Sequence, residues 1–296
     1  MCGIYSFFRN SIKKIIIWLK TIIGIFFLFF IEKDTLPSTQ EKKIFIIGNG
    51  PSAREQILAN IGKFQKTDIF AMNYMANNDF YELIKPKYYI ICDPNEFTSK
   101  ELISKELQDA RMEGWMNIVN KTTWHMSFFI PKSAYGDNDL VRLLKMNDNI
   151  SICYYNDNSF VGIERIKNYV VKNGYATFPA CTVLIPAIVL SLCMQYKKLY
   201  IFGAEHSWAK DMLCDENNNV CLIDRHSYGV VKRLLYKDNY GKEKSNMYTE
   251  MTSIANVFLQ HMEISKFATY CGANIYNVTP CSFIDAYKKI RINDIS

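Results

Sequence analysis

Short apolar runs, rich in β-branched and aromatic residues, alternate with segments of helical spacing along most of the chain. Such runs, bounded by turn-forming residues, are typical of buried strands. Strand–helix–strand steps this short predict a parallel sheet with right-handed crossovers. The pattern therefore predicts an α/β fold, Rossmann-like, with a mostly parallel sheet flanked by helices. Strands are predicted at residues 44–47, 68–73, 87–93, 150–155, 198–203 and 274–278, with a shorter one at 117–120.

The helices predicted between and after these strands differ in character. Residues 182–195 are almost wholly apolar and predict a helix buried against the sheet, with Pro186 in its first turns. Residues 247–271 predict a long helix that Gly272 ends. Residues 209–245 are polar, with Asn, Asp and Gly throughout, and predict a lid-like insertion. Further helices are predicted at residues 53–63, 79–84, 100–111, 140–146, 160–173 and 282–289.

An apolar segment precedes the first predicted strand. Its uncharged part, residues 22–31, is shorter than the roughly 20 residues that cross a bilayer. Lys13, Lys14 and Lys20 precede or interrupt it. We predict a membrane helix within residues 1–31 that lies on the surface or inserts halfway. A spanning helix, which would place the main domain outside, is the alternative; a cleaved signal peptide is disfavoured because no small-x-small site follows.

The predicted organisation is therefore an anchor at residues 1–31, a polar linker at 32–42 and a catalytic Rossmann-like domain at 43–296, with the insertion at about 209–245. With a surface helix, the catalytic domain is expected on the cytoplasmic face of the inner membrane.

Composition narrows the classes of partner. A chain of 296 residues that is 49% hydrophobic can bury the core of one large domain. The net charge of +6 is modest and its lysines are spread out, so we expect no nucleic-acid partner; a membrane surface or a phosphorylated substrate fits better. Nine cysteines, an odd number without a C-x-x-C pair, favour a reducing compartment. No Cys/His cluster has zinc spacing, so no metal site is predicted.

Polar residues stand where several predicted strands end, and ligands of open α/β sheets bind beyond these ends. The first strand runs into Gly-Asn-Gly-Pro-Ser, where two glycines allow close approach of a ligand and free N–H groups at the helix start attract phosphate. This turn also meets the dinucleotide pattern G-x-G-x-x-A. The second strand ends in an asparagine, not in the acid that holds the ribose of NAD, so a redox enzyme is disfavoured. The predicted nucleotide-binding residues here are Gly48, Asn49, Gly50, Ser52 and Asn73.

Candidate catalytic residues follow the other strand ends. Asp93 is suited to binding sugar hydroxyls or to acid–base work; the alternative is capping of the next turn. Glu205 is suited to binding substrate or orienting a neighbour, and His206 to taking a proton from an acceptor hydroxyl, unless it only bonds the loop backbone. His226 lies in the predicted lid, where it either completes the site on closing or is solvated.

Three further motifs are read as structural. His125 and His261 are interpreted as packing or surface residues. Residues 137–139 read Asp-Asn-Asp and resemble the D-x-D that holds metal-bound nucleotides in sugar transferases, but no strand precedes them, so we predict a turn.

Taken together, these features resemble bacterial sialyltransferases that modify lipo-oligosaccharide with CMP-sialic acid (glycosyltransferase family 42). In that family the first strand runs into GNGPS, which is matched letter for letter at residues 48–52, and the second strand ends in Asn, as at Asn73. Its Y-K-x-I-Y-L-x-G-x-D strand resembles residues 196–205, which read YKKLYIFGAE. The resemblance runs in order over about residues 43–290.

The resemblance implies roles for individual residues. Asn49, Ser52 and Asn73 would hold CMP, Thr182 would lie near the donor carboxylate, and Gly203 and Glu205 near the nucleotide. It also implies that no metal or other cofactor is needed and that a peripheral segment attaches the protein to the membrane. The family's catalytic histidine has no counterpart, because residues 245–248 read Ser-Asn-Met-Tyr. His206 or His226 is then left to serve as the base.

The predicted function is a membrane-associated glycosyltransferase that moves sialic acid or a Kdo-like sugar from a CMP-sugar to a cell-surface glycan. The predicted partners are the CMP-sugar donor, a glycan or lipid-linked glycan acceptor and the membrane surface, with a homo-oligomer left open. Two alternatives stay open: a diphosphokinase, since the same turn and strand resemble pterin diphosphokinase-like domains, and a non-catalytic nucleotide-binding protein.

Overall fold

The computed structural model describes residues 2–97, 105–226, 229–235 and 243–295. Its centre is an eight-stranded sheet of order β11-β10-β6-β1-β2-β3-β4-β5. Every neighbouring pair in it is parallel, as the apolar runs predict. Its strands are β1 (Lys43–Ile47), β2 (Asp68–Met72), β3 (Tyr88–Ile90), β4 (Met126–Pro131), β5 (Ile150–Tyr155), β6 (Lys198–Phe202), β10 (Asn274–Asn277) and β11 (Lys288–Lys289).

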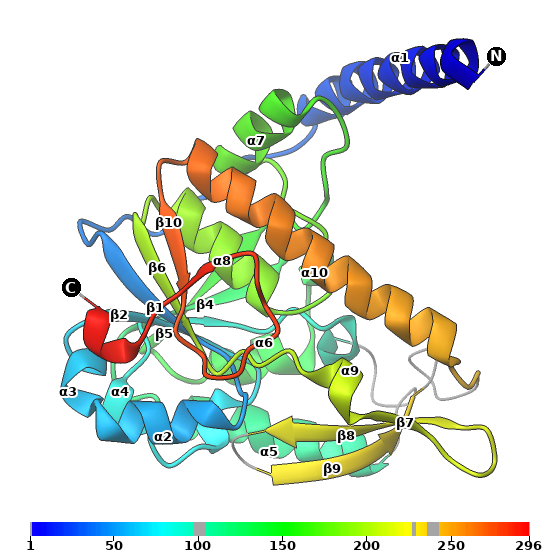
Figure 1. The fold of residues 1–296 in the computed structure, drawn as a ribbon. Helices are drawn as coiled ribbons and strands as arrows, with labels where there is room; N and C mark the ends of the chain where they lie inside the picture. The colour runs from blue at the N-terminus through cyan, green and yellow to red at the C-terminus, as the bar shows by residue number, and fades with distance from the viewer. Residues whose placement is uncertain (1, 98–104, 227–228, 236–242, 296) are drawn as a thin grey trace.

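Helices cover both faces of the sheet (Figure 1). Alternate residues of β1 divide between the two cores: Ile44 and Ile46 point into one, Phe45 and Ile47 into the other. This arrangement confirms the predicted Rossmann-like α/β architecture. The first core packs against α7 (Glu164–Lys172), α8 (Leu184–Cys193) and α10 (Met247–Tyr270); the second packs against α2 (Ser52–Ala59), α3 (Ile61–Phe64), α4 (Tyr81–Ile84), α5 (Lys105–Lys121) and α6 (Asp139–Leu144).

Two sequence predictions of secondary structure are wrong. The short strand expected at residues 117–120 is the end of α5. The helix expected at residues 282–289 does not form; the segment is a loop that leads into β11. Cys281, just before the segment, has a φ of 53°, and within the segment the Ile284 carbonyl accepts a hydrogen bond from the Asn277 side chain at 3.0 Å. Ile284 and Tyr287 of this segment are buried without a helix, while Phe283 is exposed.

The predicted insertion has secondary structure of its own. A short helix, α9 (Trp208–Asp211), leads into an antiparallel sheet of β7 (Met212–Cys214), β8 (Val220–His226) and β9 (Gly229–Leu234). Figure 1 shows this sheet at one edge of the molecule, beside α9. Val220, Cys221 and Leu222 of β8 are buried, although they belong to neither of the two cores of the large sheet.

The predicted amino-terminal helix forms as α1 (Cys2–Leu28) and extends away from the body (Figure 1). The carboxyl-terminal part of this helix contacts the domain: Thr21 is buried, and its hydroxyl accepts a hydrogen bond from the Ile163 N–H at 2.9 Å. No helix in the described ranges is both long enough and apolar enough to cross a membrane.

Residues 32–42, the predicted linker, contain no helix or strand but are held at two places. Asp34 is buried and accepts hydrogen bonds from the backbone and side chain of Asn156 at 2.8 and 2.7 Å, with Lys132 at 3.2 Å. Burial raises the pKa of Asp34 to about 6.

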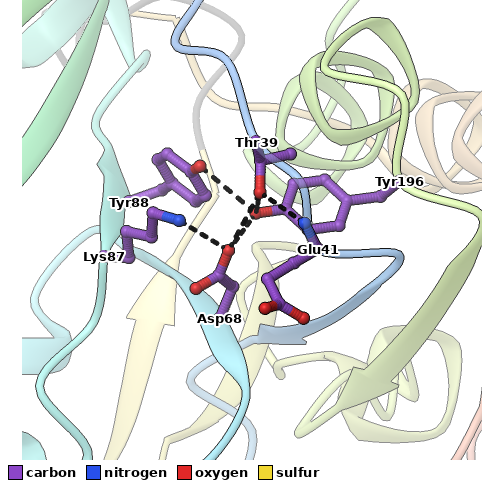
Figure 2. A network of polar contacts seen from close by, with 6 residues as sticks. All are labelled: Thr39, Glu41, Asp68, Lys87, Tyr88 and Tyr196. Carbon is purple, nitrogen blue, oxygen red and sulfur yellow. Dashed lines mark hydrogen bonds and ion pairs between the residues drawn. The ribbon is translucent and has the colours of Figure 1, made fainter.

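Further along, Thr39 joins the polar network at the amino end of the sheet that Figure 2 shows. There Tyr196 and Lys87 both bond the Asp68 carboxylate. The segment is thus bonded to the domain at Asp34 and at Thr39.

Candidate functional site

A cavity of about 480 Å³ opens at the carboxyl end of the sheet. The chain builds β1 to β5 outward on one side and then returns to place β6 on the other side of β1. Ligands of such sheets bind where the strand order reverses, and the cavity lies there. The predicted site residues that line it are Gly48, Asn49, Gly50, Asn73, Asp93, Thr182, Gly203, Glu205 and His206.

The floor of the cavity is a close packing of two backbones. The Gly48 N–H donates to the Phe202 carbonyl at 2.9 Å, so β1 and β6 stay paired up to the turn. A Cβ atom on Gly48 would lie 2.4 Å from the Gly203 carbonyl oxygen. Gly203 itself has a φ of 59°, and a Cβ there would lie 2.6 Å from the Gly48 oxygen. Both glycines are needed because the two loops touch.

Glu205 occupies the place where sequence reasoning expected a phosphate. Its Oε1 accepts a hydrogen bond from the Ser52 N–H at 2.8 Å, at the start of α2. The Gly50 N–H is also used, because it donates to the Gly203 carbonyl at 2.8 Å. A Cβ on Gly50 would lie 1.6 Å from Glu205 Oε2, so this glycine makes room for the carboxylate. The predicted free N–H cradle is therefore wrong: an internal anion fills the helix start.

Three polar atoms of the cavity wall are buried without a hydrogen-bond partner among the described residues. They are Asn49 Oδ1, Thr182 Oγ1 and Glu205 Oε2. Asn49 is held in place because its amide donates to the Met72 carbonyl at 3.1 Å. Unpaired buried polar atoms are costly unless a ligand completes them. The wall thus offers acceptors to hydroxyl or amino groups of a ligand.

The other predicted residues of the site have structural roles as well. Asn73 adopts a φ of 51°, a conformation that asparagine tolerates, and its carbonyl accepts from the Tyr89 hydroxyl at 2.5 Å. Asp93 is exposed at the cavity rim, and its Oδ1 accepts from the Asn95 N–H at 2.9 Å. The capping alternative is therefore observed. Ser52 does not line the cavity, and its part is the bond to Glu205.

His206 joins a chain of buried polar groups that sequence reasoning missed. Its Nδ1 lies 3.3 Å from Nε2 of His261, and Nδ1 of His261 lies 2.9 Å from the Tyr287 hydroxyl. Trp208 stacks on His206, with ring centroids 4.3 Å apart. Burial, and then the nearby His261, hold the pKa of His206 well below its usual value. Burial lowers the pKa of His261 to about 4, so both rings are neutral at pH 7.

The inserted sheet contributes a cation. Ile223 and Arg225 of β8 line the cavity, and Arg225 is the one cationic side chain among its described lining residues. Its Nε lies 3.1 Å from Asp211 Oδ1 of α9, which orients the guanidinium. His226 ends β8, and its side chain lies outside the described residues. Strand alternation over residues 223–226 could have pointed to Arg225, had a strand been predicted there.

The Asp-Asn-Asp motif is a turn and helix start, as predicted. Asn138 accepts a hydrogen bond from the Val141 N–H at 3.0 Å and so caps α6. Asp137 pairs with Arg142 on the surface at 2.6 Å. Neither residue lines the cavity.

The sequence matches no family model and no curated protein. A solved structure of the MAf glycosyltransferase from Magnetospirillum magneticum AMB-1 is similar over 90% of this chain, at 13% identity and a TM-score of 0.51. The match covers only 36% of that longer chain. Two solved structures of α-2,3-sialyltransferases from Campylobacter jejuni, one of them the monofunctional Cst-I and the other in apo form, each match 89% of this chain and 85% of their own, at 16% identity and a TM-score of 0.42. The predicted resemblance to glycosyltransferases is thus confirmed as a resemblance of fold.

Proposed function

We propose that this chain is a membrane-associated glycosyltransferase that transfers sialic acid or a Kdo-like sugar from a CMP-sugar to a cell-surface glycan. The observation that carries the proposal is the cavity wall: acceptors on Asn49, Thr182 and Glu205 that have no partner among the described residues share one space with the cation Arg225. A nucleoside monophosphate ester has the matching groups: donors on its base and ribose, and an anionic phosphate. The fold shared with a glycosyltransferase and the GNGPS turn support the same reading.

The transfer breaks the bond between the anomeric carbon and the phosphate oxygen, and CMP leaves with the electron pair. A bond forms from the acceptor oxygen to the same carbon, and the acceptor hydroxyl loses its proton. Arg225 is placed to balance the charge of the phosphate. Two described groups at the cavity are candidates for the proton: the exposed carboxylate of Asp93 and the His206 ring.

Replacement of Arg225 tests the proposed phosphate contact. Arg225→Gln is expected to weaken CMP binding by roughly 10- to 100-fold, since a hydrogen bond to a charged group contributes about 1.5–3 kcal/mol. Cytidine, which has no phosphate, should bind both proteins equally. Isothermal titration calorimetry with CMP and with cytidine measures the difference.

The matched control is Arg54→Gln. Arg54 also pairs with a carboxylate, that of Asp79 at 2.5 Å, but it lies on α2 outside the cavity. The substitution Arg54→Gln should leave CMP binding unchanged.

Absence of binding by CMP and CMP-sugars to the full chain would refute the proposed function. CMP release from a CMP-sugar is expected to persist in EDTA, whereas metal-dependent formation of AMP from ATP would favour the diphosphokinase.

Membrane association is proposed on the surface of α1. Its apolar side chains are mostly exposed, while Thr21 is buried against the domain. Lys13, Lys14 and Lys20 add positive charge along the same helix. An amphiphilic helix of this kind binds an anionic interface through apolar burial and charge together. We place the domain on the cytoplasmic face of the inner membrane, near a lipid-linked acceptor.

Sedimentation with vesicles that contain anionic lipid tests this placement. The full chain is expected to sediment, and a double change of Trp18 and Phe26 to Ser should lower the bound fraction several-fold, because each buried apolar side chain contributes about 1.5–3 kcal/mol. Both side chains are exposed in the structure, at 58% and 59%. Met146→Ser, at an exposed position far along the chain on the C-terminal side of α6, is the control and should have no effect. Equal binding of all three proteins would contradict the proposal.

A further inference from the structure

His261 is a polar ring set in an apolar helix face. It is fully buried on α10, whose neighbouring residues Ile264, Phe267 and Ala268 belong to the hydrophobic core. A buried imidazole is costly unless its nitrogens are hydrogen-bonded. Here both are used, one toward Tyr287 and one toward His206. The ring therefore links the core to the cavity.

Tyr287 sets the direction of this chain of hydrogen bonds. The residue is buried, and in the described part of the chain its hydroxyl has one partner, Nδ1 of His261 at 2.9 Å. A buried hydroxyl that did not donate would leave its hydrogen unpaired, at a cost of about 1–3 kcal/mol in general. The Tyr287 hydroxyl therefore donates, and Nδ1 of His261 accepts.

The hydrogen positions on the two histidine rings follow from this direction. A neutral imidazole carries one N–H, so His261 carries its hydrogen on Nε2 and donates it to Nδ1 of His206 at 3.3 Å. His206, neutral as well, then carries its own hydrogen on Nε2. Among the described residues nothing bonds that Nε2, and the ring lines the cavity. The cavity thus receives an N–H group, where sequence reasoning expected a lone pair.

We infer that His206 acts in the transfer as a neutral hydrogen-bond donor to the leaving phosphate, and that Tyr287, through His261, fixes it in the required tautomer. The inference rests on the proposed function. As the bond from the anomeric carbon to oxygen breaks, its electron pair goes to the phosphate oxygen, which accepts the hydrogen bond from His206 Nε2; no proton moves there. The acceptor proton then goes to the Asp93 carboxylate. His206 is the catalytic residue, while His261 and Tyr287 are positioning residues.

Long-range ¹H–¹⁵N correlation spectra of the full chain, labelled at histidine, measure the tautomer without any substrate. His206 is expected as the Nε2–H form, and Tyr287→Phe, which removes only the hydroxyl, should mix its two tautomers. Tyr81→Phe is the matched control: it removes another buried hydroxyl, the one bonded to Thr122 at 2.7 Å, and should leave the His206 signals unchanged. An Nδ1–H form of His206 in the unaltered protein would overturn the inference.

A titration separates this inference from the proposed function. Added CMP is expected to shift the His206 Nε2–H proton downfield, whereas cytidine should not shift it. If CMP fails to bind, the proposed function falls and the tautomer result still stands. If CMP binds with an unchanged His206 signal, CMP binding survives and the role of His206 as a phosphate donor falls.

Discussion

Gly48→Ala is expected to lower the free energy of unfolding by about 3 kcal/mol, at the upper end of the range for overpacked sites. The added Cβ would lie 2.4 Å from the Gly203 carbonyl oxygen and 3.5 Å from that of Phe202. Both are backbone atoms of β6 and of the loop after it, so neither can rotate away. The clash is relieved only if β1 and β6 separate at the carboxyl end, where they are hydrogen-bonded.

Urea denaturation followed by circular dichroism measures this loss. Gly62→Ala is the matched control, because a Cβ on Gly62 would have no atom of the described residues within 4 Å and the residue lies in α3. That change should be neutral or stabilise by up to about 1 kcal/mol, since alanine favours helix. Equal unfolding midpoints for the two variants would show that the packing of the two loops is not as described.

His206→Ala is expected to lower the rate of CMP release from the donor by about 10²- to 10³-fold, the range for losing one preorganised donor to a developing oxyanion. His206→Gln should retain much of the rate, because its side-chain amide can still donate a hydrogen bond. A general base would not be replaced by an amide, so the two substitutions separate the two roles. Steady-state release of CMP, measured with saturating acceptor, gives the comparison.

His125→Ala serves as the control for these rates. His125 is exposed just before β4, at the amino end of the strands, whereas the cavity lies at their carboxyl end. Its loss should leave the rate unchanged. If His206→Ala and His206→Gln lower the rate of CMP release equally, His206 acts as the proton acceptor and not as a hydrogen-bond donor.

The parallel sheet could be predicted because it depends on local patterns. The runs around β1, β2 and β6 are apolar on both faces and end in turn residues, which is enough to indicate buried parallel strands. The end of the chain could not be predicted in this way. Residues 282–289 have helical spacing, but the loop conformation at Cys281 and the contacts of Asn277 decide their path, and these depend on the neighbouring strands.

The sequence predicted which residues meet at the carboxyl end of the sheet, but it did not predict the hydrogen bonds between them. The strand ends meet, as expected, and nine predicted residues line the cavity. No local pattern predicts the hydrogen bond that the Ser52 N–H donates to Glu205, because the two residues lie 153 positions apart. His261 shows the same limit, since a histidine on an apolar helix face is usually a packing residue. Its part becomes visible only when α10 lies against the loop of His206.

The contact of Gly48 with Gly203 has a consequence for how substrate range can change. The floor of the cavity is made of two backbones with no room for a side chain, so substitution cannot reshape it without separating the central strands β1 and β6. The wall formed by β8 carries ordinary side chains on a sheet of its own, which tolerates exchange. We therefore expect changes of substrate range on the β8 side of the cavity, at positions other than Arg225, which the proposed function assigns to the donor phosphate.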